Sequence, residues 1–402
     1  MFAPTIQNQA SEEQWKEWGP QVVSGRWTGC YAQTELANGS NLSRLKTTAT
    51  LDRDTDEWVI HTPQPSAGKV WIGGSGVTAT HGMVMAQMKV GEKSYGLHPF
   101  LVPFRSLQTH QLLPGVAILD QGPKLGAPAM DNGYITFDSV RIPRTNLLAR
   151  FQNVDKEGNY ELRNESAKVL TRGTMTLVRV GLVEIAAHHL SRAALIAIRY
   201  AIVRRQGSGK LKDALEPQIL DYASVQQRLF TALASSYALT FVGRHLRGVY
   251  STMMAELEKS GKSPLLPIVH GFSSILKACT TNESLAGIER CRRSMGGHGY
   301  SLASGIAGFE VNQPNAGLTY EGDNNMLLGG PAANFLVKML AEAKKTGRVE
   351  REELAFLLAK APSRSSSAED LLALVGHRCR RLTEELSQLR SGAGGKSAAV
   401  LA

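Results

Sequence analysis

Hydrophobic and polar positions along this chain follow two different patterns. Between about residues 25 and 150, short runs rich in threonine, valine and aromatic residues, such as "EWVIHT" and "GYITFDSV", lie between clusters of glycine, proline, aspartate and asparagine. Such runs are typical of β-strands joined by turns. We therefore expect residues 25–150 to form an antiparallel β domain resembling a barrel or sandwich.

The second pattern begins near residue 170 and continues to about residue 345. In segments such as "TLVRVGLVEIAAHHLSRAALIAIRYAIV", apolar residues recur three and four positions apart. This spacing predicts long, mostly buried helices packed as a bundle. The predicted fold class is α+β, with the β domain followed by a helical bundle domain over residues 151–345. Residues 346–402 read as a polar linker, "KAPSRSSSAED", and a short helix.

Composition excludes several classes of protein. The four cysteines of the 402-residue chain are far apart and form no CxxC pair, which predicts neither a zinc site nor a disulfide framework. Because no stretch approaches about 18 uninterrupted apolar residues, we expect no membrane span. A net charge of +10 favours an anionic partner, which can be nucleic acid, a charged surface or a phosphate-bearing small molecule.

The stretch "VWIGGSGVTA" matches the G-x-G-x-x-A form of a dinucleotide-binding loop. A Rossmann loop opens a helix within a βαβ unit, whereas the following "THGMVMAQMKV" has the pattern of a strand. We therefore predict a β-turn or bulge, and the lack of Cβ atoms also suits close approach of a flat ligand.

Three polar features of the helical region each allow two interpretations. Glu184 and His188 are four apart, but no third ligand follows, so a helix pair is favoured over a metal site and no metal is predicted. "YAIVRRQ" closes a helix, either as a solvated end or as an anion site. In "MGGHGYS" three glycines follow a helix that a single glycine would end. This suggests that the backbone here packs closely against another group.

Taken together, the stretches "GCYAQTELANGSN", "KVWIGG", "MDNGYITFDSVRIPR", "RYAIVRRQ", "MGGHGYS" and "TYEGDN" occur in an order and spacing that resemble the peroxisomal acyl-CoA oxidases over about residues 1–345. The resemblance implies an FAD-dependent enzyme that converts fatty acyl-CoA to trans-2-enoyl-CoA and passes the electrons to O2. In that family a glutamate removes the α-proton while the flavin takes a hydride from the β carbon. By resemblance this base is Glu321, and Tyr320 beside it is expected to bind the substrate and to shield the base from water. The backbone N–H of Glu321 would hold the thioester oxygen.

The resemblance also implies binding residues. Thr34 and Gly73 correspond to flavin contacts of the family, while Arg204 and Gln206 match positions that reach the flavin of a neighbouring subunit, which implies a homodimer. Two weaker candidates are Gln226, for the flavin, and Arg179, for the substrate. The positive charge would then serve the phosphates of coenzyme A and FAD, not nucleic acid.

This chain also departs from the family pattern. Residues 1–24 are expected to be a remnant of an N-terminal helical domain, and residues 346–402 a remnant of a C-terminal one. Gly329, Gly330 and Pro331 should interrupt the helix after Glu321. Residue 72 is isoleucine where the family usually has proline.

Three functional hypotheses remain open. The first is an acyl-CoA oxidase located in the peroxisome. This location is implied by the family alone, since no targeting tripeptide closes the chain. The second is a dehydrogenase of the same reaction class that passes electrons to a protein acceptor. The third is a catalytically incomplete fragment that retains the motifs but cannot close the site.

Overall fold

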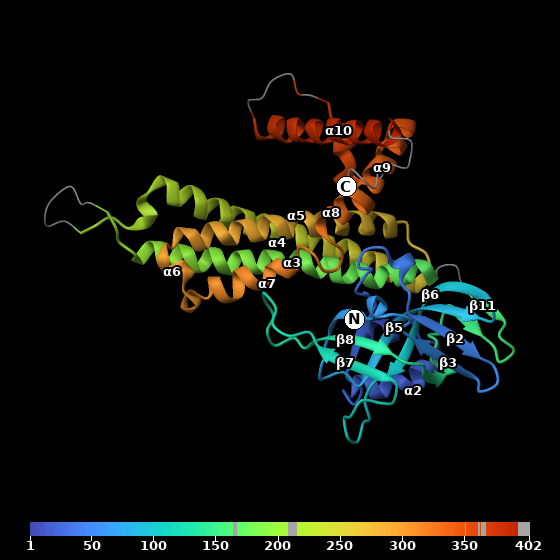
Figure 1. Ribbon diagram of the computed structural model, residues 1–402. Helices are drawn as coiled ribbons and strands as arrows, with labels where there is room; N and C mark the ends of the chain where they lie inside the picture. The colour runs from blue at the N-terminus through green and yellow to red at the C-terminus, as the bar shows by residue number, and fades with distance from the viewer. Residues whose placement is uncertain (164–166, 208–214, 350, 361, 363–366, 393–402) are drawn as a thin grey trace. The chain divides into compact units, whose positions relative to one another are not determined.

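The computed structural model describes residues 1–163, 167–207, 215–349, 351–360, 362 and 367–392. The chain divides into two compact units, Met1–Met175 and Thr176–Ala402, which follow each other along the colour gradient of Figure 1. The predicted linker over residues 360–370 lies partly outside the described residues. The α+β fold class predicted from the two sequence patterns is confirmed.

Most strands of the first unit belong to one six-stranded sheet. Inward and outward side chains alternate along β3, where Trp58 and Ile60 are fully buried, as expected for a strand with one face in a core. The strands are β1 (Gly29–Ala32), β2 (Thr48–Asp52), β3 (Glu57–His61), β5 (His81–Val90), β6 (Lys93–Pro103) and β9 (Val140–Pro143).

The six-stranded sheet is mixed, not purely antiparallel as predicted. β5 pairs antiparallel with β6, but parallel with both β1 and β2. The runs that form these parallel pairs are separated along the chain, and parallel strands need a crossover connection. A pattern of local runs and turns indicates strands but does not show this pairing.

The remaining strands of the first unit form two smaller sheets, and two helices precede the strands. The strands share one hydrophobic core, which includes Trp58, Phe100 and Phe137. The three-stranded sheet contains β4 (Lys69–Gly73), β8 (Asn132–Phe137) and β7 (Val116–Asp120), the two-stranded one β10 (Gln152–Val154) and β11 (Tyr160–Leu162), and the helices are α1 (Phe2–Gln9) and α2 (Glu12–Val23).

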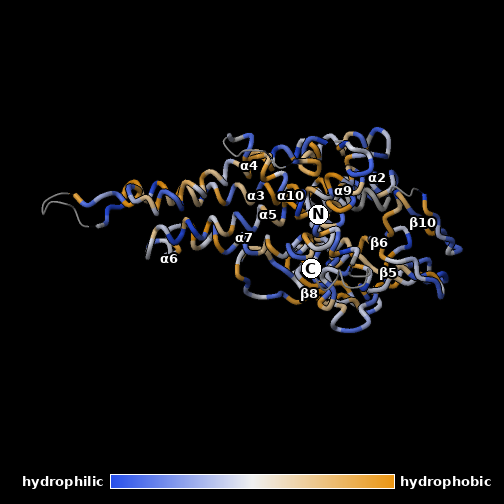
Figure 2. Tube along the Cα trace, turned by 90° about the horizontal axis from the view of Figure 1, so that it is seen from above, coloured by the Kyte–Doolittle hydropathy of each residue, from blue (hydrophilic) through white to orange (hydrophobic). Residues whose placement is uncertain are grey.

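Three long helices form the body of the second unit: α3 (Ala167–Val203), whose first turns belong to the first unit, α4 (Ala223–Ser260) and α5 (Leu265–Ser294). Orange and blue segments alternate along them in Figure 2, as expected for helices with one face in a core. By length and composition, the stretch Thr176–Val203 of α3 resembles a membrane span, which the sequence analysis did not expect. Half of its most apolar window is buried inside the protein, which is usual for a core helix.

Short helical elements follow α5 and lead to the last two long helices. They are α6 (Gly297–Tyr300), the π-helical turn η6 (Ile306–Val311), α7 (Asn312–Ala316), α8 (Asn324–Leu327), the π-helical turn η7 (Leu328–Ala332), α9 (Ala333–Thr346), the 3-10 helix η8 (Glu352–Leu358) and α10 (Ala368–Gly392).

The predicted interruption at Gly329–Pro331 is wrong, because the chain remains helical from α8 through η7 into α9. Pro331 lies inside the π-helical turn η7. A proline ring clashes with the carbonyl four residues earlier in an α-helix, and the wider π turn relieves this clash. The helix therefore accommodates the proline by changing its pitch for one turn.

Candidate active site

Glu321 lies on a strained turn between α7 and α8. Its φ is +57°, in the left-handed region, and the φ of Gly322 is +100°. A non-glycine residue held there costs about 1–2 kcal/mol. Gly322 also has no room for a side chain, since a Cβ would lie 2.8 Å from the Leu327 side chain. We call residues 320–324 the carboxylate turn.

Two cations hold the carboxylate turn by its backbone. Arg179 on α3 donates from Nε to the carbonyl oxygen of Glu321 at 2.9 Å. Lys277 on α5 donates from Nζ to the carbonyl oxygen of Gly322 at 2.7 Å and to Asn324 Oδ1 at 2.8 Å. Both cations therefore lie close to the Glu321 carboxylate while bonding to main-chain and amide oxygens.

Asn324 ties the same turn to α5. Its Nδ2 donates to the carbonyl oxygen of Ala278 at 3.2 Å, to Thr281 Oγ1 at 2.9 Å and to Asn282 Oδ1 at 3.1 Å. The side chain is buried, so these bonds satisfy polar groups that water does not reach. The position of Glu321 is thus set by α3 and α5 together.

The Glu321 carboxylate is poised to accept a proton. Its Oε2 is shielded from solvent and has no hydrogen-bond partner among the described residues. Burial raises the pKa of Glu321, although the charges of Arg179 and Lys277 oppose this effect. Burial, aided by repulsion from Arg179, lowers the pKa of Lys277 to about 8. A desolvated carboxylate with an unpaired oxygen is a stronger base than one in water.

Tyr320 contributes less shielding than the sequence analysis expected. Its side chain is 46% exposed, and its pKa is raised by burial and by the neighbouring Glu321 charge. The N–H of Glu321 donates no hydrogen bond to any residue in the described part of the chain. The turn therefore offers an unpaired carboxylate oxygen and an unpaired backbone donor at the same residue.

Thr34 lies beside β4, the strand that ends at Gly73, because the segment after β1 runs along it. The carbonyl oxygen of Thr34 accepts a hydrogen bond of 2.9 Å from the N–H of Val70. Gly73 is exposed, and the Thr34 side chain is half-buried. Trp71, two residues before Gly73 on β4, is 59% exposed with a φ of +62°. A bulky residue in the left-handed region is an outlier that often marks a functional site.

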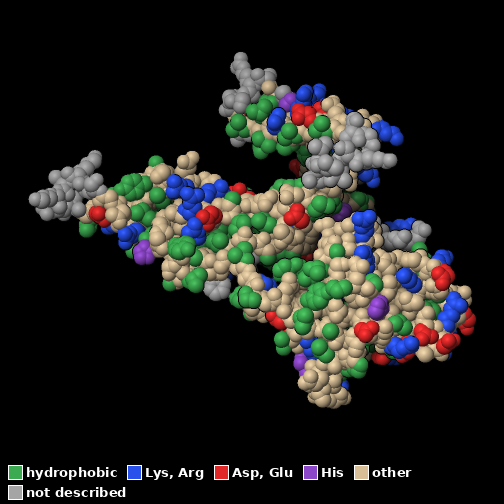
Figure 3. All heavy atoms as spheres, in the orientation of Figure 1, with side chains coloured by type: hydrophobic (Ala, Val, Ile, Leu, Met, Phe, Trp, Pro, Cys, Tyr) green, Lys and Arg blue, Asp and Glu red, His purple; other side chains and the backbone are tan. Residues whose placement is uncertain are grey.

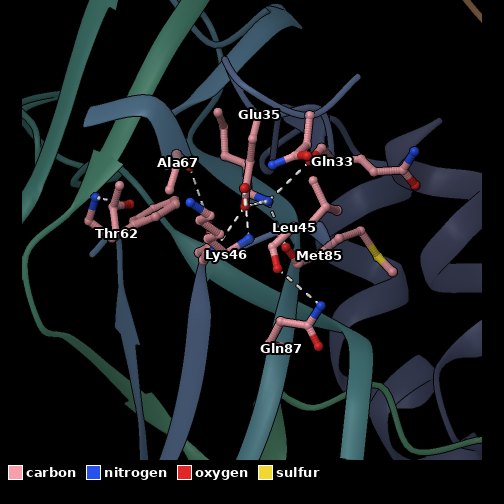
Figure 4. A network of polar contacts seen from close by, with 12 residues as sticks. Gln33, Glu35, Leu45, Lys46, Thr62, Ala67, Met85 and Gln87 are labelled. Carbon is pink, nitrogen blue, oxygen red and sulfur yellow. Dashed lines mark hydrogen bonds and ion pairs between the residues drawn. The ribbon is translucent and has the colours of Figure 1, made fainter. Parts of the chain in front are cut away.

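A buried ion pair supports this edge of β4. Lys69 is fully buried and donates from Nζ to Glu35 Oε1 at 3.1 Å, to the Met85 carbonyl oxygen at 2.8 Å and to the Gln33 carbonyl oxygen at 3.1 Å. Figure 4 shows Glu35 at the centre of this network, with Gln33, Lys46 and Met85 around it. Lys69 thus bonds to both residues that flank Thr34.

The ionisation of this pair follows from its surroundings. Burial lowers the pKa of Lys69 to about 8, although Glu35 opposes the change. Burial also opposes ionisation of Glu35, but Lys69 and the N–H groups of Thr47 and Lys46 hold the Glu35 pKa below its usual value. The carboxylate accepts from those N–H groups at 2.8 and 2.7 Å.

The loop after Gly73 is a turn between strands, and no helix follows it, as predicted. The buried Arg105 donates to the carbonyl oxygens of Ser75, Gly76 and Ala79 at 2.7–3.1 Å. Asp131 Oδ2 accepts from the N–H groups of Val77 and Thr78 at 2.7 and 2.8 Å. The loop is therefore fixed from both sides.

Arg204, Gln206 and Gln226 gather at one end of the bundle. Arg204 donates to Gln206 Oε1 at 2.9 Å, and Tyr222, at the start of the helix that carries Gln226, donates to the Gln206 carbonyl oxygen at 2.8 Å. Arg179 and Arg204 are 25 positions apart, which is roughly 37 Å along a helix. One chain therefore does not bring Arg204 to its own carboxylate turn.

The other polar candidates have structural partners. Glu184 pairs with Arg247 on α4, with Nη2 to Oε2 at 2.5 Å, and not with His188. No group of three metal-ligating side chains occurs among the described residues. In "MGGHGYS" the predicted close packing holds for Gly299, where a Cβ would lie 2.0 Å from the Arg292 carbonyl oxygen, but not for Gly296 or Gly297, where a Cβ would have no neighbour within 4 Å.

Sequence reasoning missed Lys277, Asn324, Lys69 and Trp71. A lysine between apolar and small residues in "SSILKACTT" was the available signal for Lys277, because a lysine on a buried helix face needs a partner. Lys69 likewise opens a strand whose next residues are apolar. Nothing in the local sequence indicates the left-handed backbone of Trp71.

The two regions of this chain match two domain families. The model of the acyl-CoA oxidase C-alpha1 domain matches residues 172–337, and that of the acyl-CoA dehydrogenase middle domain matches residues 30–140. The chain is 45% identical over 346 residues to peroxisomal acyl-coenzyme A oxidase 1 of Arabidopsis thaliana, covering 85% of this chain and 51% of the relative. The chain spans about half the length of the curated relatives it matches.

Solved structures agree with this match. An acyl-CoA oxidase from tomato superposes with a TM-score of 0.92 at 38% identity, covering 99% of this chain and 63% of that one. Acyl-CoA oxidase-2 of Caenorhabditis elegans, bound with FAD, ascaroside-CoA and ATP, superposes with a TM-score of 0.92 at 35% identity, covering 100% of this chain and 60% of that one. These matches assign residues 172–337 to the acyl-CoA oxidase C-alpha1 domain family and residues 30–140 to the acyl-CoA dehydrogenase middle domain family.

Proposed function

We propose that this chain is an FAD-dependent acyl-CoA oxidase that converts fatty acyl-CoA to trans-2-enoyl-CoA and reduces O2 to hydrogen peroxide. The observation that carries the proposal is the unpaired, solvent-shielded Oε2 of Glu321 on a strained turn. Because no described residue donates a hydrogen bond to this buried oxygen, it can accept a proton from a substrate.

Glu321 would take the α-proton of the acyl thioester onto Oε2. The α-carbon is a weak acid, so the base needs a raised proton affinity, and burial supplies it. The N–H of Glu321 would donate to the thioester oxygen, where negative charge develops as the proton leaves. Arg179 and Lys277 would keep the turn still, because each bonds to a carbonyl oxygen within it.

The residues of the first unit fit a flavin. The exposed backbone at Gly73 has no Cβ, the Trp71 ring is exposed beside it, and the Thr34 hydroxyl makes no hydrogen bond with the described residues. When bound, FAD supplies the hydride acceptor and the route of the electrons to O2. Thr34 and Gly73 would hold its ring system, and the Glu35–Lys69 pair would fix the segment around Thr34.

We also propose a homodimer in which Arg204 and Gln206, and more weakly Gln226, contact the flavin of the partner subunit. Support comes from the exposure of Arg204 and Gln206 and from their separation from Arg179 along α3. Cationic side chains at this end suit the phosphates of FAD or coenzyme A. A peroxisomal location is proposed because the matched relatives are named as peroxisomal enzymes.

The test compares purified wild type with the Glu321→Gln variant. We expect wild type to bind FAD and to release peroxide and enoyl-CoA in equal amounts, and the variant to keep FAD while losing at least about 10³-fold in turnover. Glu289→Gln, which removes a carboxylate paired with Arg292 on the surface of α5, is the matched control. Full activity in Glu321→Gln would refute the assignment of the base. Absence of FAD and peroxide in wild type would refute an autonomous oxidase.

A further inference from the structure

Helix α10 carries an apolar seam that the site does not use. Six side chains recur at alternating intervals of three and four residues: Leu372, Val375, Cys379, Leu382, Leu386 and Leu389. This is the a and d spacing by which one α-helix packs against another in a coiled coil. We call these six residues the α10 seam.

Five of the six residues of the α10 seam are exposed, and Leu386 is partly buried. Leu372 is 72% exposed, Val375 60%, Leu382 45% and Leu389 63%. Figure 3 shows hydrophobic side chains gathered on the visible face of α10. Contiguous exposed aliphatic side chains of this kind mark an interaction surface.

A neighbouring face of α10 is already docked onto its own chain. Thr383 is buried, Glu384 pairs with Lys344 of α9 at 3.0 Å, and Arg390 donates to the Gly329 carbonyl oxygen at 2.6 Å. These contacts fix how the helix is turned about its axis. The seam is therefore presented in one orientation and is not free to rotate inward.

We propose that the α10 seam pairs antiparallel with the α10 seam of a second copy of this chain. One register gives each of the six residues an apolar partner: Leu372 beside Leu389 of the partner subunit, Val375 beside Leu386 of the partner subunit, and Cys379 beside Leu382 of the partner subunit. The arrangement has twofold symmetry, so each contact occurs twice. It is independent of the proposed oxidase activity and of the contacts proposed for Arg204.

Charges beside the seam select the antiparallel direction. Arg378 and Glu385 are exposed and have no ion pair with residues in the described ranges. Arg378 precedes Cys379 and Glu385 precedes Leu386, and these two seam residues occupy equivalent heptad positions (position a). In the antiparallel register, the positions that precede them on the two helices lie side by side. Arg378 then meets Glu385 of the partner subunit, twice. In a parallel pair the cation facing Glu385 would be Arg390 of the partner subunit. Arg390 is already engaged within its own chain, because it donates hydrogen bonds to Gly329 and Asn334.

The experiment measures the mass of the full chain by analytical ultracentrifugation from about 1 to 100 μM, the range in which a small interface dissociates. We expect Leu382→Asp to weaken the concentration-dependent association at least tenfold. Leu374→Asp is the matched control, because Leu374 is 44% exposed on the same helix but outside the seam. Circular dichroism checks that both variants remain helical.

Charge reversal tests the direction of the pair. Arg378→Glu and Glu385→Arg should each weaken association, and the double variant should restore it. A wild type that stays monomeric throughout, or a Leu382→Asp variant that associates as wild type does, would overturn the proposal. Loss of association on Arg390→Glu, with no effect of Arg378→Glu, would overturn the antiparallel register.

Discussion

Lys277 Nζ lies 2.7 Å from the carbonyl oxygen of Gly322, and through this hydrogen bond helix α5 holds the turn that carries Glu321. The lysine bonds to the backbone and to Asn324, not to the carboxylate. A cation that bonded directly to Glu321 Oε2 would lower the proton affinity of that oxygen. The observed arrangement positions the carboxylate while leaving one of its oxygens unpaired.

Replacing Lys277 with methionine should therefore disturb both stability and turnover. The Gly322 carbonyl and Asn324 Oδ1 would lose a buried donor, at about 1–3 kcal/mol. A displaced Glu321 should lower kcat about 10- to 100-fold. Steady-state peroxide assays and urea unfolding measure the two effects.

Lys338→Met is the control for this substitution, since Lys338 is exposed on α9. It should leave both quantities within experimental error of wild type. Wild-type turnover and stability in Lys277→Met would show that the hydrogen bonds to the turn contribute nothing.

Trp71→Gly should separate backbone strain from ligand contact. Glycine adopts a φ of +62° without the penalty of about 1 kcal/mol that a larger residue carries. The exposed ring contributes little to the core, so stability should stay equal or rise. FAD affinity, measured by quenching of flavin fluorescence, should fall. Unchanged affinity would mean that the strained conformation of Trp71 does not serve the flavin.

The Glu35–Lys69 pair should be strongly non-additive in a double-mutant cycle. Each single change, Glu35→Gln or Lys69→Met, leaves the other group buried without its partner and should cost about 3–5 kcal/mol. The double variant should cost less than the sum of the two. Urea unfolding measures all four proteins, and additive losses would contradict a coupled pair.

His81 should make the protein sensitive to acid. Burial lowers the pKa of this residue, which stacks on Trp27, to about 4 from an ordinary 6.5. The unfolded chain therefore binds a proton below about pH 6.5 that the folded chain binds only near pH 4, so stability falls as pH falls through this window. The loss is about 3 kcal/mol at about 1.4 kcal/mol per pH unit.

His81→Phe keeps an aromatic ring beside Trp27 but removes the titrating group. Its free energy of unfolding, measured in urea at several pH values, should vary less between pH 6.5 and 4 than that of wild type. Parallel curves for the two proteins would mean that His81 does not cause the acid sensitivity.

Much of the fold follows from local sequence patterns, because alternation and helical periodicity reflect which side of an element is buried. The runs containing Trp58 and Leu190 thus read correctly as strand and helix. The parallel pairing of β5 with β1 and β2 was not predictable, since it joins segments far apart in the chain. The helix through Pro331 also escaped prediction, because a π turn depends on backbone adjustment that residue preferences do not encode.

The resemblance indicated Glu321 and Arg179 as site residues, and they lie side by side in the structure. The residues that support this site were harder to predict from the sequence. Lys277 and Asn324 act through hydrogen bonds that form only when α5 packs beside the turn. The raised pKa of Glu321 likewise comes chiefly from burial, which is a property of the assembled unit.

The most direct test of Glu321 as the base follows the α-proton itself. The substrate is an acyl-CoA analogue with sulfur in place of the β carbon, so that no hydride can leave and oxidation cannot proceed. FAD-loaded protein is incubated with it in D2O, and deuterium at the α carbon is measured by mass spectrometry. Wild type should introduce deuterium, whereas Glu321→Gln with FAD still bound should introduce none above the uncatalysed rate. Equal exchange in the two proteins would contradict the account.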